Sequence, residues 1–330
     1  MIDLSSHEMR VMYSFLREAS ELARRVQGGM TVERHTKGDL SPVTVADYAI
    51  QALAGQRICG AFPGMTLVAE EDARALSAPE GAPVLERVVH FVSAFIEGAT
   101  DAAVCEWIDR GAAEPGRVFW TLDPIDGTKG FLRGGQYAVA LGLVEDGRPV
   151  LGGLACPALD AECAPTAGGG MVALARRGEG AWRCADLDGA PWRQLRVSEC
   201  DDPRAARLMR SMEAAHTDTG QIDAIAREMG LAGEPVPMDS QAKFAVLAAG
   251  HGELLLRLLS PTRPDYKEKI WDHAGGAIVL EEAGGRVTDL YGKAQDFSHG
   301  RTLAANTGLL ASNGALHDRA LAAVRRVLAG

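Results

Sequence analysis

"FWTLDPIDGTKGF", residues 119–131, places Asp123 and Asp126 three residues apart, directly after an apolar run that is typical of a buried strand. Two acids at the end of such a strand repel each other unless they cap turns or a cation lies between them. The proline between them stiffens the turn, so that both aspartates and the Ile125 carbonyl can point the same way. The Gly-Thr that follows begins a helical turn, whose free N–H groups suit a phosphate oxygen.

The composition limits the classes of partner that the chain can bind. It has 330 residues, of which 47% are hydrophobic and 24% charged, with a formal net charge of −10. An acidic chain argues against a nucleic-acid backbone or an anionic membrane surface as partner. It does not exclude a small phosphorylated ligand, because bound metal ions can reverse the local charge.

The sequence also favours a cytoplasmic protein. No apolar run reaches the roughly 18–20 residues that a bilayer span needs. The N-terminal residues mix charges into a helical pattern, which differs from a signal peptide. The six cysteines lack CxxC spacing, and we expect reduced, mostly buried thiols.

Hairpins in the first half and alternating elements in the second predict layered sheets and helices, an α/β (α+β) fold. We expect one catalytic unit over residues 1–330, with halves 1–190 and 191–330 that divide in the polar stretch around 184–204. Residues 73–117 read as an insertion with helical pieces and little chemistry. Helices are expected at 6–26, 41–62, 218–230, from Ser240, at 270–283 and at 314–329. Strands are expected at 65–72, 117–122, 206–212, 253–259 and 286–292, with hairpins at 137–157 and 168–184.

Other acids also lie where predicted elements begin or end: Asp47, Glu70 with Glu71, and Asp272. Taken singly, such acids have plainer interpretations: Asp272 can be a helix cap, and Asp123 an Asx-turn before Pro124. Several carboxylates that converge without matching Lys or Arg are costly to bury unless cations lie among them. A ligand set made only of oxygen favours Mg²⁺ or Mn²⁺ over Zn²⁺. The pattern therefore suggests a metal-dependent hydrolase of phosphate esters.

"DPIDGTKGF", with "SPVTVADYAIQ" and "VAEED" upstream and "IWDHAGGAIVLEEAGG" downstream, closely resembles the lithium-sensitive, Mg²⁺-dependent inositol monophosphatase superfamily. The resemblance covers nearly the whole chain, with its motifs in the right order. It implies a layered sandwich of the αβαβα type with the site between two halves, two or three Mg²⁺ per site that Mn²⁺ can replace, and inhibition by Li⁺. The metal ligands that it implies are Glu70, Asp123, the Ile125 carbonyl, Asp126 and Asp272. It also pairs Asp47 with the Thr128 hydroxyl, helped by Glu70, to activate the attacking water.

Within this superfamily, the sequence is most similar to the 3'(2'),5'-bisphosphate nucleotidase branch, in "FLRG", "MDSQAKFAVLAAG" and "YKEKIWDHA". That similarity implies a substrate site made by Gly127, Thr128, His216, Ser240, Lys243, Arg257 and Asp272. Other interpretations remain for some of these residues. Arg257 stands alone in an apolar strand and can pair with an internal carboxylate instead; Ser240 can be an N-cap, Lys243 a solvated helix residue and His216 a histidine of a surface loop.

The resemblance implies hydrolysis of adenosine 3',5'-bisphosphate (PAP) to AMP and phosphate, with 3'-phosphoadenylyl sulfate (PAPS) as a second substrate. A first alternative keeps the chemistry but changes the substrate to an inositol (poly)phosphate or fructose 1,6-bisphosphate. A second is a nucleotide- or phosphate-binding sensor without catalysis. The sequence leaves the oligomeric state open.

Overall fold

The two aspartates of the opening stretch lie in the second strand of a seven-stranded sheet. The computed structural model describes residues 2–33, 42–165, 169–186, 189–211, 219–260 and 262–329. The first sheet follows the chain order from β1 to β7; β1 is parallel to β2, and each later neighbour is antiparallel. Its strands are β1 (Thr66–Ala69), β2 (Val118–Asp126), β3 (Ala138–Glu145), β4 (Arg148–Cys156), β5 (Met171–Arg176), β6 (Gly180–Ala185) and β7 (Arg193–Gln194). The two predicted hairpins are therefore confirmed as β3–β4 and β5–β6.

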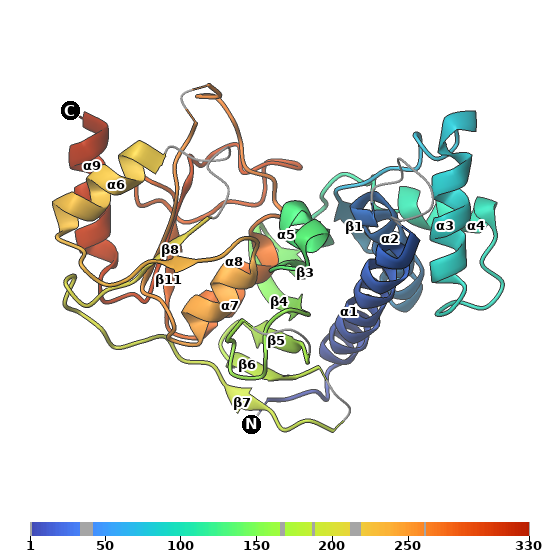
Figure 1. Cartoon of the computed structure of the whole chain (residues 1–330), viewed down its shortest axis with the longest axis horizontal. Helices are drawn as coiled ribbons and strands as arrows, with labels where there is room; N and C mark the ends of the chain where they lie inside the picture. Colours follow the sequence, from blue (N-terminus) through green and yellow to red (C-terminus); the bar gives the residue numbers. More distant parts are fainter. Residues whose placement is uncertain are drawn as a thin grey trace.

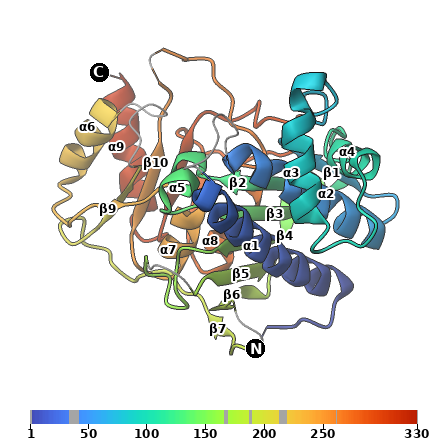
Figure 2. The ribbon, with the colours of Figure 1, turned by 45° about the vertical axis from the view of Figure 1, so that its right-hand side comes forward.

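Two long helices cover one face of this sheet (Figures 1 and 2). They are α1 (His7–Glu33), which continues past the predicted end at residue 26, and α2 (Pro42–Ala61). Their buried side chains, such as Leu16 and Ile50, form one apolar cluster with Trp120 and Leu141 of the sheet. The predicted helical pieces between residues 73 and 117 are confirmed beside α2 as η1 (Pro79–Gly81), α3 (Ala82–Val92) and α4 (Asp101–Asp109).

A second sheet lies on the other side of a middle helical layer (Figure 1). The middle layer is α7 (Ala242–Ala248) and α8 (Ala274–Glu282), whose side chains share a core with both sheets. The second sheet has the order β11-β12-β10-β8-β9. Its strands are β8 (Leu208–Arg210), β9 (Val236–Pro237), β10 (Leu254–Arg257), β11 (Arg286–Thr288) and β12 (Leu309–Ser312). The helices α6 (Thr219–Met229) and α9 (His317–Ala329) cover its outer face, so the layers follow the expected αβαβα order.

The strand β2 does not end before the acids, as the sequence suggests, but runs through them to Asp126. Asp123 pairs with Ala140 and Asp126 with Ala138, so the two residues between the aspartates stand opposite a single residue of β3. This is a β-bulge, where a strand can hold a proline because the ladder is interrupted. The bulge breaks the strict alternation of side chains, which allows both carboxylates to face one cavity.

Other boundaries also differ from the expectation. β12 is a buried strand between β10 and β11 that the sequence reading missed. α7 begins at Ala242 rather than Ser240, and α8 begins at Ala274, so that Asp272 precedes the helix. β7 lies within the polar stretch around 184–204 and still belongs to the first sheet; the division into halves at residue 190 stays a prediction.

All six cysteines are free thiols in the structure, as expected. No helix among the described residues combines the length and the apolar character needed to cross a membrane.

Candidate active site

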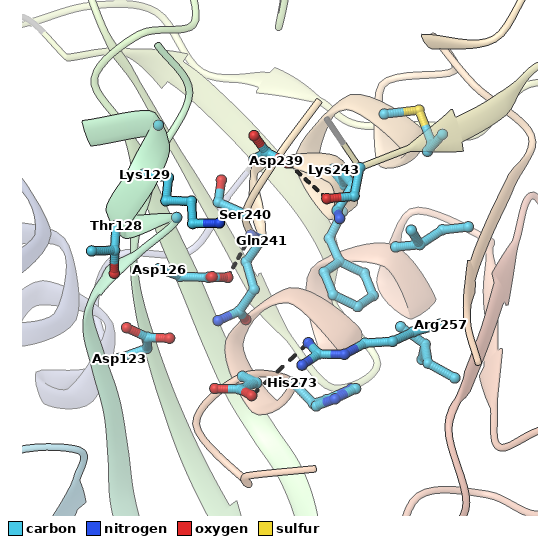
Figure 3. Close-up of a pocket in the computed structure, with 18 of the residues that line it drawn as sticks. Asp123, Asp126, Thr128, Lys129, Asp239, Ser240, Gln241, Lys243, Arg257 and His273 are labelled. Carbon is cyan, nitrogen blue, oxygen red and sulfur yellow. Dashed lines mark hydrogen bonds and ion pairs between the residues drawn. The ribbon is translucent and has the colours of Figure 1, made fainter. Parts of the chain in front are cut away.

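A cavity of about 450 Å³ is bounded by residues of both sheets (Figure 3). The end of β2 and the start of α5 (Thr128–Arg133) form one side. β8, α7, β10 and the segment before α8 form the other side. The volume lies within the range of small-molecule sites, roughly 300–1,000 Å³.

The first side carries the carboxylates of the opening stretch. Asp123 is only 3% exposed, and its Oδ1 atom is buried with no hydrogen-bond partner among the described residues. Asp126 accepts a hydrogen bond from the Gln241 backbone N–H at 2.6 Å. Glu70, at the solvent-exposed rim, and Asp272, on the segment before α8 across the cavity, complete the group of acids. The structure therefore brings the four predicted acidic ligands, together with Ile125, to one cavity.

Burial and mutual repulsion make these carboxyl groups hard to ionise. Burial, followed by the charges of Asp126 and Glu70, raises the pKa of Asp123 well above its usual value. Burial raises the pKa of Asp272 to about 7, against the opposing effect of Arg257. Burial of the carboxyl group, followed by the charges of Glu71 and Asp126, raises the pKa of Glu70 to about 7, although the residue as a whole is exposed at the rim. A cation among these groups would favour their charged forms.

The oxygen ligands at this site fit Mg²⁺, although the carboxylates are too far apart to hold the ion as they stand. Within the part of the chain that the structure describes, no three His, Cys, Asp or Glu side chains are grouped closely enough to hold a metal ion as they stand. Every candidate donor is an oxygen, as hard divalent cations require. The buried, unpartnered Oδ1 of Asp123 is a polar atom that a bound cation would satisfy. Glu70, Asp123, Ile125, Asp126 and Asp272 are the residues that could hold such an ion.

Gly127 lets the two sides of the cavity approach each other. It has a φ of 93° and precedes α5, and a Cβ atom there would lie 2.7 Å from the Ser240 Cβ. Ser240 itself has a φ of 65°, a left-handed conformation that costs a non-glycine residue of order 1 kcal/mol or more. The close approach brings Gln241 within reach of Asp126. Only glycine fits at position 127.

The second side combines cations with apolar surface. Lys243 lines the cavity, and burial lowers the pKa of its ammonium group, so it is not the solvated helix residue of the alternative interpretation. Arg257 faces Asp123 and Asp126 across the cavity (Figure 3). The apolar part of this side is Met209, Ile222, Phe244, Leu255, Leu256 and Leu309.

Arg257 has the internal carboxylate that the sequence left open as a partner, and it also lines the cavity. Its Nε pairs with Glu268 at 3.0 Å, which is the internal carboxylate, and its side chain also lines the cavity. Its Nη1 lies 4.0 Å from an Asp272 carboxylate oxygen. The guanidinium is thus anchored by one edge and turned toward the cavity by the other. Ser240 likewise does two things, since it lines the cavity and its Oγ accepts from the Ala242 N–H at 3.2 Å.

Three predicted residues remain to be placed: Thr128, Asp47 and His216. Thr128 lines the cavity, whereas Asp47 does not; Asp47 is 8% exposed, and burial, followed by the charge of Glu71, raises its pKa. No hydrogen bond joins Asp47 to Thr128 among the described residues, so their pairing stays a prediction. His216 lies outside the described residues.

Sequence reasoning missed Gln241, which ties three segments of the site together. Its backbone N–H donates to Asp126, its Nε2 donates to the Trp271 carbonyl at 3.0 Å, and its Oε1 accepts from the Gly276 N–H at 3.2 Å. It is 2% exposed. A glutamine between Ser240 and Lys243 carried no signal by itself, because its partners are distant in the sequence.

The comparison with known proteins gives the family. Residues 6–329 match the sequence profile of the Inositol monophosphatase family. The chain belongs to this family. The resemblance inferred from the motifs is therefore confirmed.

Several relatives of this inositol monophosphatase family member are 3'(2'),5'-bisphosphate nucleotidases by name. That of Emericella nidulans is 40% identical over 319 residues, which cover 89% of this chain and 90% of the relative. That of Schizosaccharomyces pombe is 36% identical over 343 residues, with 97% and 95% covered. That of Oryza sativa is 40% identical over 309 residues, with 88% and 85% covered.

Solved structures of the family have the same fold. The IMPase of Thermotoga maritima gives a TM-score of 0.63 at 21% identity, covering 98% of this chain and 99% of its own. SuhB of Mycobacterium tuberculosis gives 0.61 at 22% identity, with 96% of each chain covered. These likenesses confirm the layered αβαβα fold.

Proposed function

We propose that this protein is a Mg²⁺-dependent phosphomonoesterase that hydrolyses adenosine 3',5'-bisphosphate to AMP and phosphate. The nucleotidase name of relatives that are 36–40% identical over nearly the whole chain supports this substrate. The sulfated analogue, 3'-phosphoadenylyl sulfate, carries the same base and the same 3'-phosphate, and we include it as a second substrate.

The observation that carries the proposal is the mixed lining of the cavity. Asp123, Asp126 and Lys129 line one side, while Lys243, Arg257, the apolar surface and the acids Asp239 and Asp272 line the other. Inositol phosphates and fructose 1,6-bisphosphate have no flat apolar group to place against Phe244 and Leu255. A nucleotide has a base for the apolar surface and two phosphates for the cations. The nucleotide therefore accounts for more of the lining than the alternative esters do.

The proposed roles follow from this arrangement. Glu70, Asp123, Asp126, Asp272 and the Ile125 carbonyl would hold Mg²⁺. When bound, the ions lower the pKa of water and stabilise the charge on the phosphoryl oxygens. Lys243 and Arg257 hold the anionic substrate against the apolar surface.

We assign the activation of water to Thr128 and Asp47. The Thr128 Oγ1 is too weak a base alone, and a carboxylate behind it can hold the proton that the water gives up. Burial and the charges of Glu71 and Glu70 raise the pKa of Asp47, which makes its carboxylate a stronger base. The hydroxide attacks the 3'-phosphorus in line, the bond to the ribose 3'-oxygen breaks, and that oxygen takes up a proton from solvent.

A panel of esters tests the function. We expect phosphate release with Mg²⁺ to have its highest kcat/KM for adenosine 3',5'-bisphosphate, compared with inositol 1,4-bisphosphate and fructose 1,6-bisphosphate, and to fall when Li⁺ is added. A higher kcat/KM for either sugar phosphate would replace the nucleotide as substrate. Absence of Mg²⁺-stimulated release from all three would support a non-catalytic binding protein instead.

A further inference from the structure

Arg301 reaches from the second half of the chain to the peptide groups around the end of β1. Its Nη2 donates to the carbonyl oxygen of Ala69, and its Nη1 donates to those of Ala113 at 3.0 Å and Gly111 at 3.3 Å. The guanidinium thus has three backbone acceptors, all more than 180 residues earlier in the sequence. Ala69 is the residue directly before Glu70.

The same side chain stacks on the residue directly before Asp272. The guanidinium carbon lies 4.9 Å from the centroid of the Trp271 ring, which is 4% exposed. The backbones of the two segments are also joined. The Ile270 N–H donates to the Arg301 carbonyl at 3.3 Å, and the Leu303 N–H donates to that of Glu268 at 2.8 Å.

One guanidinium therefore connects two arms of the carboxylate group. The Glu70 arm is the end of β1, and the Asp272 arm is the segment 268–272. The next residue on the Glu70 arm is fixed from its own half, because the Glu71 N–H donates to the Gln51 Oε1 at 2.9 Å. Among the described residues, Arg301 is thus hydrogen-bonded to the Ala69 carbonyl in the first half and stacked on Trp271 in the second.

We propose that Arg301 is a positioning residue for the divalent cation: it holds the Glu70 and Asp272 arms at the separation that cation binding needs. Repulsion between carboxylates drives such arms apart when no ion is present. An arginine suits the task because its planar fork donates several hydrogen bonds while its face stacks on an aromatic ring. The assignment rests on the proposed function, in which these carboxylates hold Mg²⁺.

Arg301→Lys tests the proposal, with Arg177→Lys as the matched control. Arg177 also joins distant segments, since it donates to the Pro149 carbonyl at 2.9 Å and pairs with Glu281 at 2.6 Å, and neither contact lies on the Glu70 arm or the Asp272 arm. Each lysine keeps the charge and loses the fork. Binding of Mn²⁺, followed by the electron paramagnetic resonance signal of the free ion, gives a readout that does not need turnover.

We expect R301K to bind Mn²⁺ about tenfold more weakly than the wild type, as is usual when a residue that orients metal ligands is changed. R177K should bind it as the wild type does. The Mg²⁺ concentration that gives half-maximal turnover should rise by a similar factor in R301K, while kcat at saturating Mg²⁺ changes much less. Trp271→Phe, which weakens the stack but keeps an aromatic ring, should shift Mn²⁺ affinity in the same direction by a smaller factor.

Unchanged Mn²⁺ affinity in R301K and in W271F would overturn the proposal, even if both variants melt at lower temperature, because a purely structural brace predicts that result. Equal weakening in R177K would overturn it as well. If R301K does not fold, W271F decides alone. The proposed function is tested separately by the ester panel. It would be contradicted if the wild type showed no Mg²⁺-stimulated hydrolysis, and Mn²⁺ binding would still test the role of Arg301.

Discussion

The two sides of the cavity differ in how their charges are balanced. On the carboxylate side, Asp123 is buried with an unpartnered oxygen, and its neighbours raise its pKa further. On the opposite side, the charge of Arg257 is met by Glu268 at 3.0 Å. The first side therefore has a buried polar atom that a cation would satisfy, whereas on the second side the Arg257 guanidinium is held at one edge by a carboxylate and lines the cavity with the other. In the proposed function, the reaction depends on the first side and the choice of substrate on the second.

Removing one charge from the carboxylate side should produce the largest effect. We expect Asp123→Asn to lower kcat roughly a hundred- to a thousandfold, as when a key electrostatic contact in the transition state is lost. The same variant should raise the Tm of the metal-free protein, because it removes a buried charge that has no partner. Each kcal/mol gained in the free energy of unfolding raises Tm by roughly 2–4 °C. Phosphate release and thermal melting measure the two effects.

Asp289→Asn is the control for a buried aspartate that has its partners. Asp289 is 1% exposed and accepts from the N–H groups of Tyr291 and Lys293, both at 2.9 Å. We expect D289N to lower Tm and to leave kcat near the wild-type value. If D123N and D289N shift Tm in the same direction, the contrast between an unsatisfied and a satisfied carboxylate is wrong.

A change on the opposite side should act on substrate binding. We expect Arg257→Lys to raise KM for adenosine 3',5'-bisphosphate roughly tenfold or more, since hydrogen bonds to charged groups contribute about 1.5–3 kcal/mol, while kcat changes much less. If Arg257 holds the phosphate that is not cleaved, the loss should be smaller for adenosine 3'-monophosphate. Steady-state kinetics with both nucleotides measure this. A fall in kcat with KM unchanged would move Arg257 from the substrate to the chemistry.

Local signals in the sequence explain which elements could be predicted. The helices α1 and α2 and the hairpins β3–β4 and β5–β6 follow from periodicity and turn residues, which are local signals. The carboxylates were recognisable because acids rarely end a buried strand, and the family motifs add to that signal. The strand β12 was missed because a short apolar run between glycines has no period long enough to identify it.

The contacts that complete the site could not be predicted, because they join residues that are far apart in the sequence. The course of β2 through Asp126 depends on its pairing with β3. The donation from Gln241 to Asp126 spans 115 residues, and that from Arg301 to Ala69 spans 232. Residues 73–117, which we expected to hold little chemistry, supply the carbonyls of Gly111 and Ala113 to Arg301. Such partners are set by tertiary packing.

The smallest predicted effect is on the pH dependence of the metal-free protein. The pKa values of Glu70 and Asp272 rise from 4.5 and 3.8 to about 7 in the folded chain. The native state then binds more protons than the unfolded state between about pH 4 and pH 7, so the stability from these groups falls as pH rises. His317 acts in the opposite direction. It is buried between Thr288 and Ser312, burial lowers its pKa to about 4, and its stabilising effect is lost as pH falls below 6.5.

Because the two effects overlap in pH, the carboxylate part has to be isolated by difference. A Glu70→Gln, Asp272→Asn double variant keeps His317, so its contribution cancels when the Tm of the variant is compared with that of the wild type. We expect similar Tm values near pH 4 and a more stable variant at pH 8, each measured without metal. Adding Mg²⁺ at pH 8 should raise the Tm of the wild type and not that of the variant, since the ion replaces the missing protons. A Tm difference that stays constant from pH 4 to pH 8 would mean that the two carboxyls titrate normally, and that the carboxylate side needs no cation to balance it.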